Sequence, residues 1–210
     1  MSYKYIYIFI TVLMVFTGCR IPFFPETGKP TKSHHSRSTP EGLISQLVQS
    51  YESRRLDLFE DLLADSFRFY VAPSFKNAFI AAYPNSDREA PDTALRFIDN
   101  SESYYFWTKS LEIQSHSKLL SNDKVSEIKF YSPLEISSKR YAVAKNGDTV
   151  NVELLTNGGA FEIRMTQSAT EMLVYSVSIE KQVFYLERDS DRLWVIRKWY
   201  DLSSAPNLVE

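Results

Sequence analysis

Cysteine and histidine are scarce in this sequence of 210 residues. One cysteine cannot form an intramolecular disulfide, and it excludes every metal site built from several thiolates. Three histidines leave little material for a zinc centre or for histidine-based catalysis. Charge of either sign is not in excess either, because 24 Lys and Arg stand against 26 Asp and Glu, a net charge of -2. Without a basic surplus, binding to nucleic acid is not expected.

Sequence motifs for cofactors are also missing. The chain has no glycine-rich nucleotide-binding motif, so the sequence predicts no cofactor. It also has no repeat at solenoid spacing. What is present is ordinary for a globular protein, with 44% apolar, 24% charged and 14% aromatic residues. The aromatic content favours β-sheet. The length suits one domain with short appendages.

An apolar run covers residues 5–16 near the amino terminus. It is shorter than the roughly 20 residues that a membrane span needs, and it fits the core of a secretion signal. The small residues Thr17 and Gly18 follow, and then the sole cysteine, Cys19. This arrangement resembles the signal of bacterial lipoproteins, the lipobox, although Phe16 stands where leucine is usual. The resemblance implies cleavage before Cys19 and attachment of the mature protein to a membrane through lipid on Cys19.

The chain therefore divides into a signal peptide over residues 1–18, a flexible tether over 19–38 and a folded domain over 39–205. Arg20 stands where an aspartate would retain a lipoprotein in the inner membrane. In a cell envelope with two membranes, we therefore expect the outer one to hold the anchor. The alternatives are an uncleaved anchor and a plain secretory signal, which would make the protein secreted.

The tether is rich in proline and lacks a periodic apolar pattern. His34 and His35 are adjacent in this segment, and no Cys, Asp or third His lies nearby in the sequence. A solvated linker explains them better than a metal site does, so no metal ligand is predicted.

Two amphipathic helices open the folded domain. Thr39 followed by Pro40 is typical of a helix start, because a hydroxyl caps the first turn and proline fits its first position. Apolar residues recur on one helical face at Leu43, Ile44, Leu47, Val48 and Tyr51, and again at Leu58, Phe59, Leu62 and Leu63. Asp65 is expected to end the second helix and to bond the turn, rather than to act as a base. Alternation over residues 67–71 then predicts a strand.

A third helical region is expected within residues 93–111, with the aromatic residues 104–107 forming one of its faces. The second half of the chain alternates between apolar and polar residues, which predicts strands. Asn146-Gly147 is a strong signal for a type I′ hairpin turn. Further turns between strands are predicted at residues 157–159 and 189–191.

Helices that precede a run of antiparallel strands predict an α+β fold, with the amino-terminal helices packed on a curved antiparallel sheet. Residues 39–43, 51–58, 62–69 and 192–201 carry a resemblance to the nuclear-transport-factor-two-like superfamily, and above all to bacterial lipoproteins with this domain. The resemblance implies a cone-shaped, cystatin-like domain whose cone leaves a cavity. It also implies a sheet that is able to pair with a second copy, as a homodimer.

Ketosteroid isomerases belong to this superfamily. The resemblance places their carboxylate base at Val71 and their tyrosine acid at Leu47. Both side chains are aliphatic and neither transfers a proton, so no catalytic residue is assigned.

Whether an acidic side chain of the later strands points into the cone distinguishes an enzyme from a binding protein. The acidic residues considered on these strands are Glu153, Glu162, Glu171 and Glu187. Alternation places Glu153 and Glu162 on the solvent side. Glu112 and His116 lie four residues apart without a third partner, which favours a surface pair. A buried carboxylate in the cone with a strongly raised pKa would contradict this view.

Candidate ligand contacts are mainly aromatic. They are Tyr51, Tyr104, Tyr105, Trp107, Arg197 and Trp199. Plain core is the alternative for the aromatic residues, and a rim position beside a surface acid is the alternative for Arg197. The sequence thus favours a non-enzymatic envelope lipoprotein whose cone binds a small apolar ligand or a protein partner. The alternative is an enzyme of the isomerase, dehydratase or hydrolase type with an atypical acid in the cone.

Overall fold

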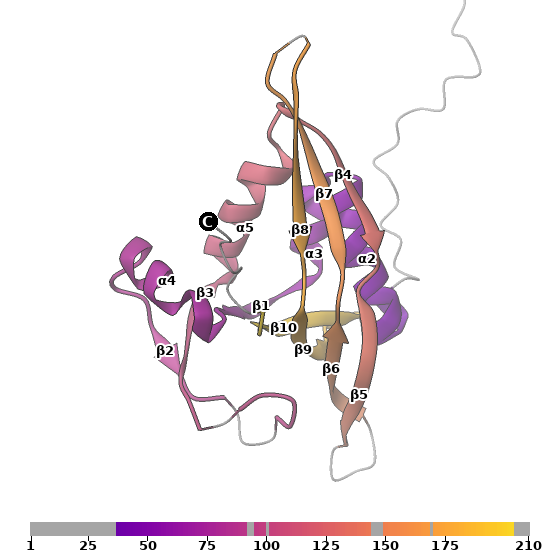
Figure 1. Cartoon of the computed structure of the whole chain (residues 1–210). Helices are drawn as coiled ribbons and strands as arrows, with labels where there is room; N and C mark the ends of the chain where they lie inside the picture. The colour runs from indigo at the N-terminus through magenta and orange to yellow at the C-terminus, as the bar shows by residue number, and fades with distance from the viewer. Residues whose placement is uncertain (1–36, 92–94, 100, 144–148, 169, 204–210) are drawn as a thin grey trace, which may run out of the picture. The chain divides into compact units, whose positions relative to one another are not determined.

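A computed structural model describes residues 37–91, 95–99, 101–143, 149–168 and 170–203 (Figure 1). The helices are α2 (Pro40–Glu52), α3 (Leu56–Asp61), the short 3-10 helix η2 (Pro73–Phe75), α4 (Lys76–Ala82) and α5 (Lys109–Leu120). The strands are β1 (Leu63–Tyr70), β2 (Arg88–Glu89), β3 (Tyr104–Thr108), β4 (Val125–Ser132), β5 (Glu135–Val143), β6 (Thr149–Asn157), β7 (Ala160–Thr166), β8 (Met172–Ser178), β9 (Lys181–Arg188) and β10 (Trp194–Asp201). Within these described ranges, no helix is long and apolar enough to cross a membrane.

Helix α2 begins where the sequence predicts. The Thr39 hydroxyl accepts a hydrogen bond from the Gly42 N–H at 3.0 Å, and Pro40 occupies the first turn. The predicted apolar face is buried at Leu43, Ile44, Leu47 and Tyr51. Arg37, assigned to the tether from the sequence, is buried, and its guanidinium lies 3.6 Å from a carboxylate oxygen of Asp189.

The second helix ends earlier than predicted, and the role expected for Asp65 is wrong. Helix α3 ends at Asp61, and strand β1 already starts at Leu63. Asp65 therefore lies within β1, where its side chain is fully exposed and its carboxylate is 3.5 Å from Lys109 Nζ. Leu63 is buried in the core, which explains why an apolar helical pattern continues into the strand.

The strands form a seven-stranded sheet in the order β2-β3-β1-β10-β9-β6-β5 and a three-stranded sheet in the order β4-β7-β8. Strand β1 pairs with β10 in parallel, and the other pairs are antiparallel. Helices precede most strands and pack on the bent sheet, which confirms the predicted α+β class.

The two sheets are joined by chain segments that bend from one into the other: β4 into β5, β6 into β7, and β8 into β9 (Figure 1). The turn predicted at residues 157–159 is present between β6 and β7, but these two strands do not pair with each other. Strand β6 pairs with β5 and β9, whereas β7 pairs with β4 and β8. Glycine makes the bend feasible, because Gly159 has φ +143° and a Cβ there would lie 2.9 Å from Leu134 Cδ2.

Of the two other predicted turns, one lies outside the described residues and the other is confirmed. Asn146-Gly147 lies outside the described residues, but the flanking strands β5 and β6 do form an antiparallel pair, as the hairpin prediction requires. The turn at residues 189–191 is confirmed between β9 and β10. Its Asp189 carboxylate accepts hydrogen bonds from the N–H groups of Asp191 and Leu193, at 3.0 and 2.8 Å.

The predicted third helix is wrong over most of its length. Residues 104–108 form strand β3, which pairs with β1 so that Trp107 lies opposite Phe69. The helix in this region, α5, runs from Lys109 to Leu120. Four aromatic residues in a row have a strand preference, and here they overrode the apparent helical spacing.

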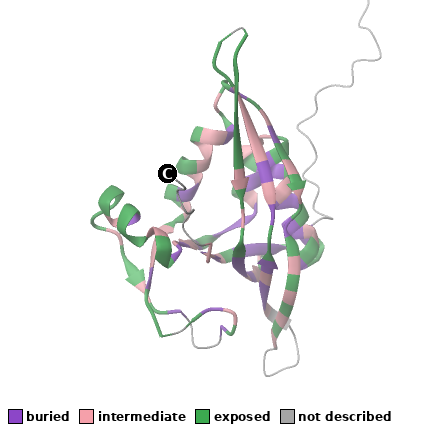
Figure 2. Ribbon diagram, in the orientation of Figure 1, coloured by how far each residue is buried: buried purple, intermediate pink, exposed green. Residues whose placement is uncertain are grey.

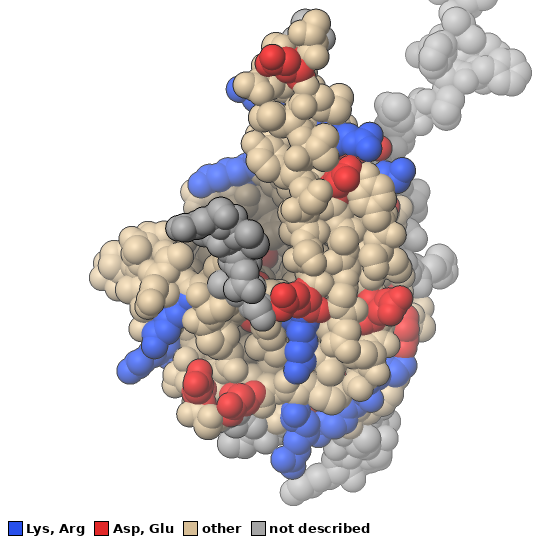
Figure 3. All heavy atoms as spheres, in the orientation of Figure 1, with Lys and Arg blue, Asp and Glu red and all other residues tan. Residues whose placement is uncertain are grey.

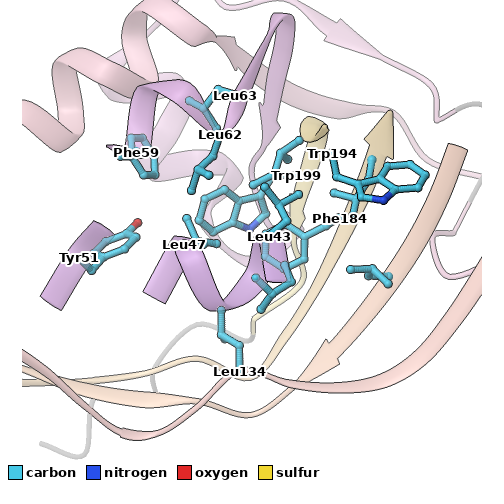
Figure 4. Packing of buried hydrophobic residues seen from close by; sticks show 14 of the residues in the cluster. Leu43, Leu47, Tyr51, Phe59, Leu62, Leu63, Leu134, Phe184, Trp194 and Trp199 are labelled. Carbon is cyan, nitrogen blue, oxygen red and sulfur yellow. The ribbon is translucent and has the colours of Figure 1, made fainter. Parts of the chain in front are cut away.

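The main core lies between the helices and one face of the large sheet. It includes Leu43 and Leu47 of α2, Phe59 of α3, Phe184 of β9 and Trp199 of β10 (Figure 4). Strands β9 and β10, which contribute Phe184 and Trp199 to this core, are buried over much of their length (Figure 2). A second cluster occupies the opposite face and consists of Tyr70, Leu95, Ile98, Tyr104, Val183 and Tyr200. Alternation along β9 and β10 assigns neighbouring residues to the two clusters.

Candidate functional site

The domain contains a pocket of about 650 Å³ bounded by residues of α2, α5, β1, β3 and the bent strands. Figure 3 shows this face of the domain hollowed between the segment that carries α4 and strand β8. A volume of this size accommodates a small organic molecule. The bend of the sheet creates the pocket, because the curved strands close around a space that the helices fill only in part.

Aromatic residues dominate the pocket wall. They are Tyr51, Phe69, Phe75, Trp107, Phe130, Phe161 and Trp199. The aliphatic residues of the wall are Leu47, Leu134, Val177 and Ile179. Carboxyl groups come from Glu112, Glu180 and Asp201, and the described lining residues include no Lys or Arg. The wall is thus apolar, aromatic and acidic.

Three of the six candidate ligand contacts line this pocket, namely Tyr51, Trp107 and Trp199. Their role in ligand binding stays a prediction. Tyr104 is instead buried in the second cluster, edge-on to Tyr200, and Tyr105 is not among the lining residues.

Arg197 is exposed and lies outside the pocket wall. Its guanidinium is 3.1 Å from a carboxylate oxygen of Glu187, as the rim alternative proposed. Simple alternation would place Arg197 and Trp199 on one side of β10, but Arg197 is exposed whereas Trp199 is buried. The register of β10 against β9 shifts between Ile196 and Lys198, and a bulge of this kind reverses the alternation.

Glu112 and His116 do not form a surface pair, which corrects the sequence prediction. Glu112 lies in the first turn of α5 and is fully buried. The Trp107 Nε1–H donates a hydrogen bond to Glu112 Oε2. The other carboxyl oxygen, Oε1, is buried and has no hydrogen-bond partner among the described residues. Burial raises the pKa of Glu112 to about 8, although the Trp107 bond acts in the opposite direction.

His116 is held as a neutral imidazole. Its Nδ1 lies 3.0 Å from the backbone carbonyl oxygen of Glu112, so Nδ1 carries the hydrogen and donates it. Its Nε2 then accepts a hydrogen bond from the Tyr51 hydroxyl. The ring stacks on Phe59 with centroids 4.1 Å apart. Burial lowers the pKa of His116 to about 4, despite the bond to the carbonyl, and it raises that of Tyr51.

The cluster formed by Glu112, His116 and Tyr51 has defined protonation states near neutral pH. Glu112 is mainly a neutral acid with one unpaired oxygen, and His116 is a neutral base whose lone pair Tyr51 occupies. The sequence held a signal that we did not use: Glu112, His116 and Leu120 recur every four residues, so all three share one helical face, and Leu120 is buried.

Glu153 also contradicts its predicted exposure. It is 2% exposed, and its carboxylate accepts hydrogen bonds from the backbone N–H groups of Arg96 and Phe97. The Arg140 guanidinium lies 3.0 Å away. The alternation of β6 is as predicted, but residues 95–98 cover the face that the sequence assigned to solvent.

The other three acids considered from the sequence, Glu162, Glu171 and Glu187, lie outside the pocket wall. Glu162 is partly exposed and accepts a hydrogen bond from Tyr131, and Glu171 is exposed. Of the two positions that isomerase chemistry would need, Leu47 lines the pocket and Val71 does not.

Metal binding finds no support in the described part of the chain, where no group of three potential ligands lies together. The His34-His35 pair and the lipidation candidate Cys19 lie outside the described residues. The proposed signal peptide and most of the proposed tether do so as well.

No family model and no curated protein matches the chain. Among solved structures, an NTF-2 like protein of unknown function from Shewanella oneidensis MR-1 is 10% identical, covers 75% of this chain and 91% of its own, and has a TM-score of 0.38. A ketosteroid isomerase-like protein from Erwinia carotovora atroseptica is 10% identical over 79% of this chain and 93% of its own, with a TM-score of 0.40.

A nuclear transport factor 2-like superfamily protein from Salmonella enterica serovar Typhimurium is 9% identical over 85% of this chain and 94% of its own, with a TM-score of 0.42. Similarity at this level concerns the arrangement of helices and strands and carries no argument about activity. Any function must therefore be argued from the pocket itself.

Proposed function

We propose that this domain binds a small, mainly apolar molecule in its pocket. The observation that carries the proposal is a cavity of about 650 Å³ whose wall is largely aromatic and aliphatic. A pocket of this size and lining, with a few polar groups on one side, is the usual form of a small-molecule site. Burial of apolar ligand surface contributes about 25 cal/mol per Å² before the costs of association.

Filling the pocket is expected to abolish binding of an apolar probe. Val177 lines the pocket, is only partly buried on β8 and lies opposite the pocket residue Phe161 of β7, so Val177→Phe directs a larger ring into the pocket. We expect the fluorescence gain of the neutral probe N-phenyl-1-naphthylamine to require at least tenfold more protein in Val177→Phe than in the wild type.

Val174→Phe is the matched control for this test, because Val174 is exposed on the same strand and does not line the pocket. It should bind the probe as the wild type does. Equal binding by the wild type and Val177→Phe would show that the probe sits elsewhere and would remove the support for a binding pocket.

An acid–base enzyme is a second candidate, and Glu112 is the observation that favours it. A buried carboxyl in the pocket wall with a pKa of about 8 is the feature that the sequence argument against catalysis named as its counter-evidence. A 5-ene steroid ketone discriminates the two candidates. Turnover that is at least a hundredfold faster in the wild type than in Glu112→Gln would favour the enzyme, and equal rates would favour simple binding.

We also propose that the mature protein is anchored in the cell envelope through Cys19. Support comes from the position of this sole cysteine, which directly follows an apolar run and two small residues. A lipid anchor would hold the pocket near the membrane surface, where apolar molecules accumulate.

Cys19→Ala is expected to block processing in a bacterial host. The variant should accumulate as an unprocessed precursor that incorporates no labelled palmitate, because the thiol that accepts the lipid is gone. Serine at the neighbouring position, Gly18→Ser, keeps the thiol and serves as the control. Equal palmitate labelling of Cys19→Ala and wild type would refute the anchor.

A further inference from the structure

Charge in the pocket wall is of one sign. Glu112, Glu180 and Asp201 contribute carboxyl groups, and no Lys or Arg belongs to the lining that the structure describes. A carboxylate or phosphate ligand would be desolvated there without a countercharge, which is costly. The wall therefore selects against anions.

Glu112 supplies a second and independent observation. Its Oε1 is buried and lacks a hydrogen-bond partner within the described fold, although the residue belongs to the pocket wall. His116 Nδ1 is 3.4 Å from Oε1, but its hydrogen is directed at the backbone carbonyl. A buried carboxyl without a cationic partner is expensive to ionise unless the cation arrives with a ligand.

The aromatic wall provides the other half of a cation site. Trp107 stacks on Phe69 with ring centroids 5.1 Å apart, and Trp199 meets Phe69 edge-on at 5.4 Å. All three rings line the pocket. Indole and phenyl faces attract ammonium groups, and the attraction grows when water is excluded.

We propose that the pocket binds an organic monocation, an amine on an apolar or aromatic body, whose ammonium group packs on the aromatic wall with Glu112 as its buried countercharge. This inference rests on the proposed binding function and names the chemical class of the ligand. Glu180 and Asp201 add to the same negative potential from the pocket wall.

The pH dependence of binding depends on the groups around Glu112. His116 on α5 lies 3.4 Å from Glu112, and Tyr51 on α2 bonds to His116. The elements that pack against α5 also carry acids, namely Asp65 on β1, which pairs with Lys109, and Asp57, Glu60 and Asp61 on α3. His116 and Tyr51 are both neutral between pH 5 and pH 9, because burial lowers the pKa of the first to about 4 and raises that of the second. Asp57 and Glu60 are exposed.

A cation near Glu112 favours its ionised form and therefore lowers its pKa from the value of about 8 in the empty pocket. Amine binding must then release a proton at pH 7. Affinity should rise with pH up to about 8 and then level off. A neutral ligand that accepts a hydrogen bond from the protonated acid would show the opposite trend, with affinity lost above pH 8.

Three matched probes test the proposal: phenethylamine, 2-phenylethanol and phenylacetate, which are a cation, a neutral molecule and an anion. Binding to the full-length protein is followed by tryptophan fluorescence, because Trp107 and Trp199 line the pocket. At pH 8.5 we expect the amine to bind at least tenfold more tightly than the other two. Its affinity should fall roughly tenfold or more between pH 8.5 and pH 6.5.

Glu112→Gln should lose at least tenfold in amine affinity at pH 8.5 and should lose the pH dependence, whereas Glu171→Gln, which alters an exposed acid outside the pocket, should lose neither. Calorimetry of the wild type in buffers of different ionisation heat gives a second readout, the release of about one proton per amine at pH 7. This readout needs no variant.

Tighter binding of 2-phenylethanol or phenylacetate, or an unchanged Glu112→Gln, would overturn the proposal. If none of the three probes binds while N-phenyl-1-naphthylamine does, the cation class fails and the binding function stands. If that neutral probe also fails to distinguish Val177→Phe from the wild type, the binding function itself fails.

Discussion

Glu112→Gln is expected to abolish the loss of stability that the wild type shows between pH 6.5 and pH 9. In the wild type, Glu112 has a pKa of about 8 in the folded state and an ordinary value of 4.5 when unfolded. A raised folded pKa contributes stability that is fully present below pH 4.5 and is lost as pH rises to 8. The loss is about 1.4 kcal/mol per pH unit.

His116 contributes with the opposite sign. Its pKa is about 4 in the folded state and 6.5 unfolded, so the unfolded chain binds the additional proton between these values. Stability from His116 is therefore present above pH 6.5 and is lost as pH falls to 4. The two contributions offset each other between about pH 4.5 and pH 6.5. The wild type should then lose about 2 kcal/mol between pH 6.5 and pH 8.

In Glu112→Gln only the histidine contribution remains. Its free energy of unfolding should rise up to pH 6.5 and stay level to pH 9, so its stability relative to the wild type should grow by about 4 to 5 kcal/mol from pH 4.5 to pH 9. Urea denaturation at each pH measures this difference. Glu171→Gln, at an exposed acid, should parallel the wild type. Parallel curves for Glu112→Gln and the wild type would contradict a buried, protonated Glu112.

Glu153→Ala is expected to destabilise the domain by about 3 to 5 kcal/mol. The substitution leaves the N–H groups of Arg96 and Phe97 without the Glu153 acceptor and removes one ion pair of Arg140. Buried donors that lose a partner cost more than the average hydrogen bond contributes. Urea denaturation gives the magnitude, and faster amide hydrogen exchange at Arg96 and Phe97 locates the effect.

Glu162→Ala is the matched control for this prediction. Glu162 lies on β7, which continues β6, but it is partly exposed and bonds to Tyr131 at the surface. Its loss should cost under about 1 kcal/mol. Similar costs for the two substitutions would show that Glu153 does not anchor residues 95–98.

Local rules predicted those parts of the fold whose signals come from neighbouring residues. The Thr39 cap, the apolar face of α2 and the turn closed by Asp189 depend on contacts within a few residues, so the sequence was sufficient. A turn at Gly158 and Gly159 was predicted from their glycines, but a hairpin turn and a bend from one sheet into another both accept positive φ. Only strand pairing over long separations distinguishes the two.

The candidate site was predicted less well, for a physical reason. Alternation shows which face of a strand Glu153 occupies, but it does not show that residues 95–98 cover that face. Spacing likewise places Glu112 and His116 on one side of a helix, while their burial comes from Tyr51 and Phe59, more than fifty residues earlier in the chain. Tyr51 and Trp199 were identified because aromatic residues in a cone tend to line its cavity.

The most direct test of this account is a carbon-13 NMR titration of the glutamate side-chain carboxyl carbons, with the Glu112 signal assigned by its absence in Glu112→Gln. The account predicts a midpoint near pH 8 in the empty protein, set by burial, and a lower midpoint once phenethylamine is bound. A midpoint near 4.5 that the amine leaves unchanged would contradict it, because Glu112 would then be an ordinary carboxylate unconnected to a ligand pocket.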